Sequence, residues 1–310
     1  MRNEADSMGT MQVPDNALYG ASTQRAVLNF PISGRPMPSG FVRGLGLVKW
    51  AAAKANVELK KLDPKLADII CQAAEEVYEG KLDAHFPVDV FQTGSGTSSN
   101  MNANEVIANR VSQIAGKAVG SHEPAHANDH VNMGQSSNDI IPTVLHVSGV
   151  IALKSQLIPA LEILQHALEA KSKEFEDVMK IGRTHLMDAT PLTLGQEFSG
   201  YAAQVKKSIE RAKHSINVLS ELAIGGTAVG TGINCHPDFP SLVCKHLKER
   251  TGIAFYEARN HFEAQGGRDD AVEVAGELAT IAASLTKIAN DIRLMGSGPR
   301  AGIFEINLPA

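Results

Sequence analysis

Three polar stretches carry the residues of this 310-residue chain that could do chemistry. They read TGSGTSSNMNANE (93–105), HANDHVNMGQSSND (126–139) and GRTHLMDATPLTLGQE (182–197), the last with Thr184 beside His185. Ser, Thr and Asn side chains are neutral hydrogen-bond donors, and the free N–H groups of a helix start would add more. If the stretches converge, they predict a pocket for a small anion with several carboxylate oxygens. A histidine beside it could move a proton near neutral pH.

Helix capping is the alternative for each stretch taken alone, because Ser, Thr and Asn are the preferred N-cap residues. A lone histidine also usually has no catalytic role. The combination of three such stretches with one histidine is what favours a binding site over capping.

Other kinds of site are disfavoured by their context. TGSGT is not followed by the Gly-Lys-Ser/Thr of a phosphate-binding loop, and no Gly-x-Ser-x-Gly elbow of a serine hydrolase occurs. GGTAVGTGIN (225–234) follows a long helical pattern rather than a strand, so it is expected to end that helix and reverse the chain, not to bind a dinucleotide. His122, His126 and His130 are four apart, but Pro124 argues against a continuous helix that would gather them around zinc. We therefore expect no phosphate-binding loop, no dinucleotide site and no zinc site in these stretches.

The composition excludes several classes of protein. The net charge is −5 and no block of like charge occurs, so nucleic acid is not an expected partner. Three cysteines, an odd number, indicate reduced thiols in a cytosol-like compartment rather than a disulfide framework. The N-terminus is polar and no apolar run approaches ~20 residues, so neither a secretory signal nor a membrane span is expected.

The elements that must position the polar stretches are helices. The chain is 43% hydrophobic but only 5% aromatic, which favours aliphatic helical cores. Shorter helices are predicted at 41–59, 64–78 and 103–115, within an N-terminal domain of residues 1–135 whose first 40 residues read as extended or loop structure. Residues 136–310 carry three long patterns with apolar residues three and four apart, the seam of packed near-parallel helices. These seams are Val150 to Leu168, Phe198 to Leu219, and Val274, Leu278, Ile281, Leu285, Ile288, Ile292 and Met295. Small residues on other faces, such as Ala282, Ala283 and Ala289, suggest an oligomeric bundle, with a monomeric bundle as the alternative.

Taken together, the motifs resemble the class II fumarases of the fumarase/aspartase superfamily. The resemblance rests on TGSGTSSNMNANEVIANR, VNMGQSSNDIIPT, GRTHLMDATPLTLGQE and GTAVGTGIN, and it extends from about Asp6 to Pro309. It implies an all-α fold, with a long-helix bundle shared by four subunits and each active site drawn from three of them. It also implies reversible hydration of fumarate to (S)-malate without metal or organic cofactor, with no nucleic-acid or membrane partner.

The resemblance assigns roles residue by residue. His185 resembles the histidine that acts through a water in proton transfer, and Thr184 a substrate contact beside it. The other expected substrate contacts are Ser95, Gly96, Thr97, Ser136, Ser137 and Asn138. A second anion site is expected at His126, Ala127, Asn128 and Asp129. The chain departs from the family near this second site, with Ala127 in place of a frequent proline and Met133-Gly134 in place of Lys-Ser.

The expected chemistry explains the need for many donors. Removing water from malate requires loss of a proton from the carbon next to a carboxylate, and the negative charge moves onto that carboxylate. Preorganised donors and a positive charge would stabilise it, and a histidine would help the hydroxyl leave.

The family's glycine-serine loop, with the serine taken as the carbon-acid base, does not occur in these 310 residues. The chain is therefore expected to be the N-terminal two thirds of a fumarase, without its C-terminal domain, and to have little or no activity alone. The alternatives are an ammonia lyase acting on aspartate, against which Thr184-His185 argues, and a non-catalytic oligomerisation fragment. The expected compartment is the cytoplasm, or the mitochondrial matrix in a eukaryote.

Overall fold

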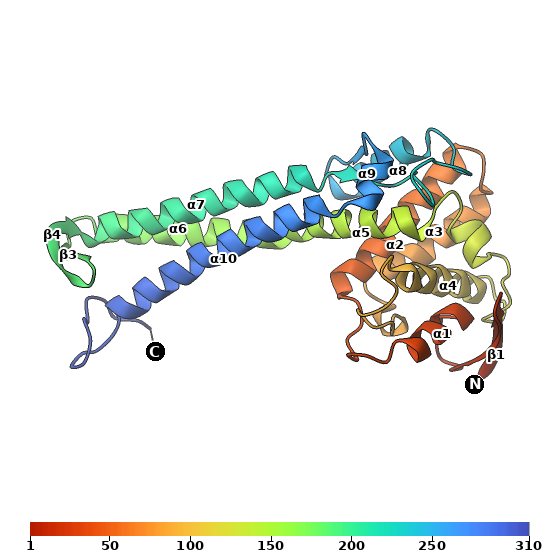
Figure 1. Cartoon of the computed structure of the whole chain (residues 1–310), viewed down its shortest axis with the longest axis horizontal. Coiled ribbons are helices and arrows are strands. Elements are labelled where there is room, and N and C mark those ends of the chain that lie inside the picture. The colour runs from red at the N-terminus through yellow and green to blue at the C-terminus, as the bar shows by residue number, and fades with distance from the viewer. Residues whose placement is uncertain (310) are drawn as a thin grey trace. The chain divides into compact units, whose positions relative to one another are not determined.

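The computed structural model describes residues 1–309 and is mainly helical, with three two-stranded sheets (Figure 1). It divides into two compact units. Unit 1 comprises Met1–Gly149 and Leu219–Arg268, and unit 2 comprises Val150–Val218 and Asp269–Ala310. The predicted boundary at residue 135 differs from this division, because the chain returns to unit 1 after its first long helices. The all-α fold class is confirmed.

Unit 1 is a cluster of helices around α2. Its helices are α1 (Ala21–Asn29), α2 (Ser39–Glu58), α3 (Pro64–Tyr78), α4 (Thr97–Ile114), the start of α5 (Ser137–Ala152), α8 (Phe239–Thr251) and α9 (His261–Gly266), with short turns η1 (Asp83–His85) and η2 (Ala127–Val131). Its strands are β1 (Arg2–Asp6) and β2 (Gly9–Val13), which are antiparallel, and β5 (Glu221–Leu222) and β6 (Tyr256–Glu257), which are parallel.

Helix α2 can lie at the centre of this unit because most of its side chains are small or apolar. It packs against α3, α4 and α8. A Cβ atom added to Gly46 would lie 2.6 Å from the backbone nitrogen of Tyr78, so the close approach of α2 and α3 requires glycine there. The N-terminus of α3 is capped by Asp63, whose side chain accepts from the backbone N–H of Leu66, with proline at the first helical position.

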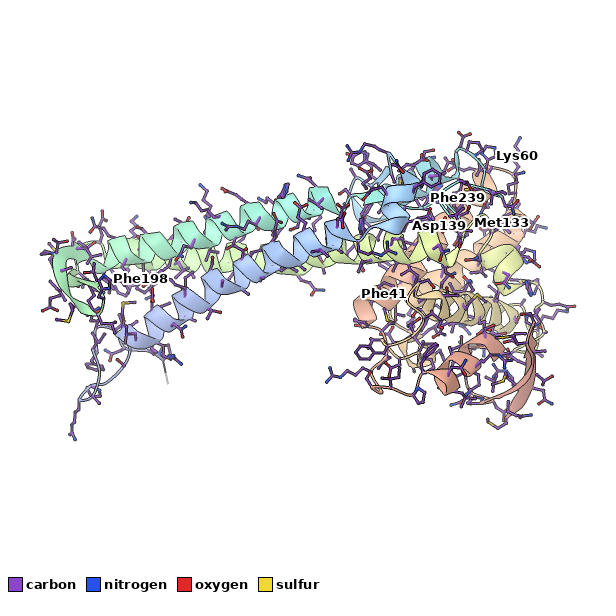
Figure 2. The ribbon with its side chains drawn as sticks, in the orientation of Figure 1. Phe41, Lys60, Met133, Asp139, Phe198 and Phe239 are labelled. Carbon is purple, nitrogen blue, oxygen red and sulfur yellow. The ribbon has the colours of Figure 1, made fainter. Side chains whose placement is uncertain are left out.

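Unit 2 is built from long helices and one hairpin. Its elements are η3 (Leu153–Leu157), α6 (Ile158–Glu174), β3 (Met179–Thr184), β4 (Met187–Thr193), α7 (Leu194–Val218) and α10 (Asp269–Met295). Helix α7 packs against both α6 and α10 (Figure 1). Phe198 lies near its start (Figure 2). The Phe198 ring makes edge-on contacts with Phe175 and Tyr201, with centroids 5.4 and 5.5 Å apart.

The predicted seams are confirmed for α7 and only half buried in α10. In α7 the residues Phe198, Ala202, Val205, Ile209 and Ala212 are all buried. In α10 every seventh residue is buried (Val274, Ile281, Ile288 and Met295), whereas Leu278, Leu285 and Ile292 are not. One face of α10 therefore packs within the unit and a second apolar face does not.

Two sequence expectations are corrected. Helix α4 begins at Thr97 and not at residue 103, so the predicted loop runs into the helix. The segment from Ser137 to Glu174 is one helix, long and apolar enough by length and composition to cross a membrane, whereas no such run was expected. Core helices of soluble proteins share this property, and this one carries apolar residues that are buried in the fold, such as Val150 and Leu161.

Candidate functional site

The first donor loop, residues 93–97, ends at the start of α4. Gly96 precedes the helix with φ of 68° and has no side chain to cap it, and Gln92 Oε1 accepts from the Ser99 N–H at 3.0 Å. The hydroxyls of Ser95 and Thr97 are hydrogen-bonded to each other at 2.8 Å. A Cβ atom on Gly96 would lie 3.0 Å from the side chain of Ile141, so α5 packs directly on this turn. Ser95 and Thr97 therefore do not cap this helix, and the N–H groups of Thr97 and Ser98 stay available for an anion.

The second donor loop, residues 132–138, leads into α5. Ser136 and Asp139 cap this helix, because the Ser136 backbone N–H donates to Asp139 Oδ1 at 2.9 Å and the Asn138 N–H donates to Ser136 Oγ at 3.3 Å. Ser137 Oγ accepts from Asn100 Nδ2 at 2.9 Å. Since both hydroxyl oxygens accept from inside the protein, the hydroxyl protons of Ser136 and Ser137 remain available for an anion.

The glycine loop, residues 223–234, forms the opposite wall. The Asp139 carboxylate accepts from the backbone N–H groups of Gly225 and Thr227 at 3.1 and 2.8 Å, and Asn138 Nδ2 donates to the Ala228 carbonyl at 2.7 Å. Between the loops lies a cavity of about 360 Å³. It is lined by Asn132, Gly134, Gln135, Ser136, Ser137, Thr227, Ala228, Ile233 and Asn234. From the sequence, this loop was expected only to end a helix and reverse the chain. Its contribution to the lining of the cavity was not predicted.

A neighbouring cavity of about 350 Å³ brings the two donor loops together. Ser95 and Asn138 both line it, with Ala228 shared between the two cavities. Arg268 lies on the same wall and adds a positive charge that sequence reasoning expected but did not assign. The predicted convergence of the first two stretches is therefore seen within unit 1.

Two buried ionisable groups lie behind the second donor loop. Burial raises the pKa of Asp139 to about 6, although three backbone N–H bonds and the charge of Lys49 act in the opposite direction. Burial also lowers the pKa of the Lys49 ammonium to about 7, against the attraction of Asp139. Neither residue was singled out in the sequence, because nothing in its local pattern distinguishes it from a cap or a surface lysine.

Thr184 and His185 belong to unit 2 and are exposed at the tip of the β3–β4 hairpin. Thr184 pairs with Met187, so His185 and Leu186 form a two-residue connection, with φ of 53° and 60°. Lys180 and Arg183, both in β3, form ion pairs with Glu305. Within unit 2, Thr184 and His185 are thus exposed at the end of a hairpin that is tied to Glu305.

The residues of the expected second anion site form the turn η2 in unit 1. His126 Nδ1 accepts from the Asp129 N–H at 3.3 Å, and His130 Nδ1 accepts from the His126 N–H at 2.9 Å. His126, Ala127 and Asn128 line a cavity of about 380 Å³ together with the acidic residues Glu4, Asp6 and Glu105. Those carboxylates bind N–H groups or arginines of the N-terminal segment, as Glu105 does with Gly20, Ser22 and Thr23. An anion site here stays a prediction.

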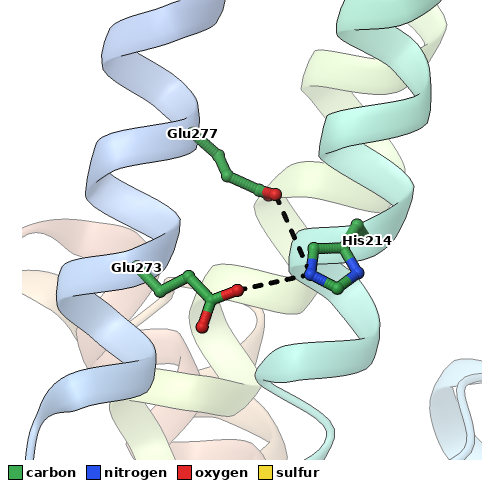
Figure 3. Close-up of side chains that lie close together, drawn as sticks. All are labelled: His214, Glu273 and Glu277. Atoms are coloured by element: carbon green, nitrogen blue, oxygen red, sulfur yellow. Dashed lines mark hydrogen bonds and ion pairs between the residues drawn. The ribbon is translucent and has the colours of Figure 1, made fainter.

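Another group of side chains joins α7 and α10. His214 Nε2 lies 3.3 Å from a Glu273 oxygen and 4.0 Å from a Glu277 oxygen (Figure 3). Within residues 1–309, these three side chains form the one group of His, Cys, Asp or Glu residues in which at least three potential metal-ligating atoms all lie within 4.8 Å of one another. His214 and Glu273 are exposed, and Ser215 Oγ also donates to Glu277, so ion pairing between the helices explains the cluster.

Comparison with known proteins places this geometry in a family. A lyase family profile matches residues 9–310. Class II fumarate hydratase of Neisseria meningitidis is 52% identical over 308 residues, covering 99% of this chain and 67% of that protein. Mitochondrial fumarate hydratase of Saccharomyces cerevisiae is 53% identical over 310 residues, covering 99% of this chain and 63% of that protein.

Solved structures of similar proteins indicate the same family. The class II fumarase of Schistosoma mansoni has a TM-score of 0.94 at 39% identity, over 97% of this chain and 66% of that one. A fumarate lyase/delta crystallin from Brucella melitensis, solved with cobalt, has a TM-score of 0.95 at 43% identity, over 100% of this chain and 67% of that one. The chain thus spans about two thirds of the length of these relatives. With this likeness along nearly its whole length, the chain belongs to the class II fumarate hydratase family of lyases.

Proposed function

We propose that the protein catalyses the reversible hydration of fumarate to (S)-malate. The observation that carries the proposal is the pair of donor loops that meet at one wall, where Ser136 and Ser137 have hydroxyl protons free for a carboxylate. Family membership supports the same reaction. The substrate is a small dicarboxylate, bound by Ser95, Gly96, Thr97, Ser136, Ser137 and Asn138.

In the dehydration direction, the loss of a proton from carbon places a second negative charge on the adjacent carboxylate. The hydroxyls of the second donor loop and the N–H groups at the start of α4 are fixed donors for that charge. Donors held in place before the reaction need no reorganisation in the transition state. Arg268 on the neighbouring wall contributes positive charge.

His185 serves the departing hydroxyl in this proposal, through a water, and Thr184 positions the ring or the oxygen. Because both residues are exposed on a hairpin of unit 2, we propose that they complete a site of another subunit in a homotetramer. The unburied apolar residues of α10 support an assembly of this kind. The glycine-serine loop expected to carry the carbon-acid base does not occur in these 310 residues, so the 310-residue polypeptide should turn over little substrate by itself.

We also propose a reducing compartment for the protein, the cytoplasm or the mitochondrial matrix. Cys71, Cys235 and Cys244 are all free thiols, and burial raises the pKa of each. Protonated thiols of this kind are slow to react and need no disulfide partner.

Replacing His185 by asparagine in the full-length protein tests the proposal. Loss of the acid should lower kcat for malate dehydration by a factor of about 10² to 10⁴. The measurement is the ultraviolet absorbance of fumarate, with helical circular dichroism as the check on folding. His166→Asn, an exposed histidine of α6, is the matched control and should retain normal turnover.

A wild-type protein that releases ammonia from aspartate and leaves malate unchanged would favour the ammonia-lyase alternative. Robust malate turnover by the 310-residue polypeptide would contradict the expectation that these residues lack the base.

A further inference from the structure

The interior of unit 1 contains a lysine that the proposed mechanism does not use. Lys49 lies in the middle of α2, and its side chain is fully buried. Its neighbours along the helix, such as Val48, Ala51 and Ala52, are buried and apolar. An ammonium group is unfavourable in such a place unless its protons are hydrogen-bonded and its charge is balanced. The contacts of Lys49 should therefore show what it is for.

Lys49 binds the second donor loop from behind. Its Nζ donates to Asn132 Oδ1 and to Gln135 Oε1, both at 2.8 Å. The nitrogen ends of the two amides point to the loop itself, since Asn132 Nδ2 donates to the Gln135 carbonyl and Gln135 Nε2 donates to the carbonyls of Val131 and Met133. Because the amide donors are used in this way, both amide oxygens face the position of Lys49 and require a donor there.

A chain of hydrogen bonds continues from this contact to the candidate site. Asn132 Oδ1 also accepts from Asn100 Nδ2 at 3.2 Å, and the same nitrogen donates to Ser137 Oγ at 2.9 Å. Asn100 is fully buried, so its amide is held between Asn132 and Ser137. The bond from Asn100 keeps the Ser137 oxygen as an acceptor and leaves its proton for a ligand.

The charge of Lys49 is balanced inside the same unit. Asp139 is the ionisable residue whose charge acts on Lys49 within the described chain, and it is also fully buried. Its carboxylate is occupied by the backbone N–H groups of Ser136, Gly225 and Thr227. Asp139 therefore fixes the loop to its opposite wall, and the ammonium remains bound to neutral amides.

We propose that Lys49 is a positioning residue for substrate carboxylate binding, which acts through Asn132 and Asn100 to direct the Ser137 hydroxyl toward the ligand. The inference rests on the proposed function, because it assumes that Ser137 donates to a dicarboxylate. Lys49 itself does not contact the substrate.

A double-mutant cycle in the full-length protein tests this role. The readouts are KM for malate and the inhibition constant of succinate, a dicarboxylate that cannot be hydrated. Lys49→Met keeps the aliphatic stem and removes the donors, and it should raise both constants about tenfold, the effect of one lost oriented hydrogen bond. In a Ser137→Ala background the same change should alter them less than about twofold, because the group on which Lys49 acts is already gone.

Lys54→Met is the matched control, since Lys54 lies on the same helix and pairs only loosely with Asp68, at 3.9 Å. It should change both constants less than about twofold in either background. If Lys49→Met fails to fold by circular dichroism, Lys49→Gln takes its place in the cycle, because its amide still satisfies one of the two acceptors.

The inference is wrong if the lysine variant behaves like Lys54→Met, or if its effect is undiminished in the Ser137→Ala background, as a general structural role would give. A wild-type protein that neither converts malate nor binds succinate would overturn the proposed function, and this inference with it.

Discussion

Asp139 and Lys49 have opposite charges and opposite surroundings, although both are fully buried. The carboxylate accepts from backbone N–H groups of two loops, and the ammonium donates to side-chain amides of one loop. Backbone donors cannot be changed by substitution, so Asp139 holds the chain path. Side-chain acceptors can be replaced, so the hydrogen bonds of Lys49 can be altered by substituting either the lysine or its acceptors.

The lowered pKa of Lys49 predicts a dependence of stability on pH. Its folded pKa is about 7, below the value of 10.5 of a free lysine, so between these values the unfolded chain binds a proton that the folded chain does not. Stability should therefore rise with pH through this window, by up to about 1.4 kcal/mol per pH unit from this group. Lys49→Met should remove that part of the slope.

The measurement is urea unfolding of both proteins between about pH 7 and about pH 8.5. The three cysteines, whose pKa values are raised by burial, affect both proteins alike, so their contribution cancels in the difference between the two slopes. Equal slopes for wild type and Lys49→Met would contradict a lowered pKa for Lys49.

At the scale of the elements, both donor loops precede helices, but the two helix starts differ. Helix α5 is capped by Ser136 and Asp139 of its own loop, whereas the α4 start is bound only by Gln92, which accepts from the Ser99 N–H. In the proposed site the second loop therefore combines capping with anion binding, and the first loop keeps the N–H groups of Thr97 and Ser98 free. The sequence alone could not separate the two roles, because the same residue types serve both.

The β3–β4 hairpin has a connection that its sequence does not favour. His185 and Leu186 both have positive φ, where Gly and Asn are preferred. Leu186→Gly should remove the side-chain strain and raise the free energy of hairpin opening by about 1 kcal/mol. Hydrogen exchange of the β3 and β4 amides measures this opening.

Met187→Gly is the matched control, since Met187 is also exposed but lies in strand β4. Glycine should lower protection there. Equal effects of the two glycine substitutions would show that the connection is not strained.

At the scale of the whole molecule, the second apolar face of α10 is the feature that the fold of unit 2 leaves uncovered. Leu278 is 40% exposed, whereas Val274 and Ile281 on the same helix are buried. We propose that this face, which carries Leu278, Leu285 and Ile292, is an interaction site. The proposed tetramer would cover it with helices of other subunits.

Leu278→Glu in the full-length protein should therefore shift the proposed tetramer toward smaller species, because a buried unpaired carboxylate is strongly unfavourable. Sedimentation velocity measures the change. Thr280→Glu, which adds the same charge at an exposed polar position nearby, should leave the assembly intact. An unchanged mass for Leu278→Glu would place the subunit interface elsewhere.

Local pattern was sufficient where a helix carries its own signals. Helix α3 was predicted to the residue, because Asp63-Pro64 starts it. The apolar seam predicted from Phe198 lies in α7, although that helix begins four residues earlier, at Leu194. Local pattern failed where packing overrides propensity. Ser98, Ser99 and Asn100 are poor helix formers, yet they are buried in the first turns of α4.

The sequence by itself determined the family, the helical class and the candidate donors, because these depend on residue types and on their spacing along one chain. Only the tertiary structure shows that the glycine loop lines the candidate site, that Arg268 lines the same cavity as Ser95, and that Lys49 is linked to Ser137 through Asn132 and Asn100. Those relations join α2, α4, α5 and the glycine loop, which are far apart in sequence. A buried charge is recognisable only once its acceptors are in place, since its energy depends on its partners and not on its neighbours in the chain.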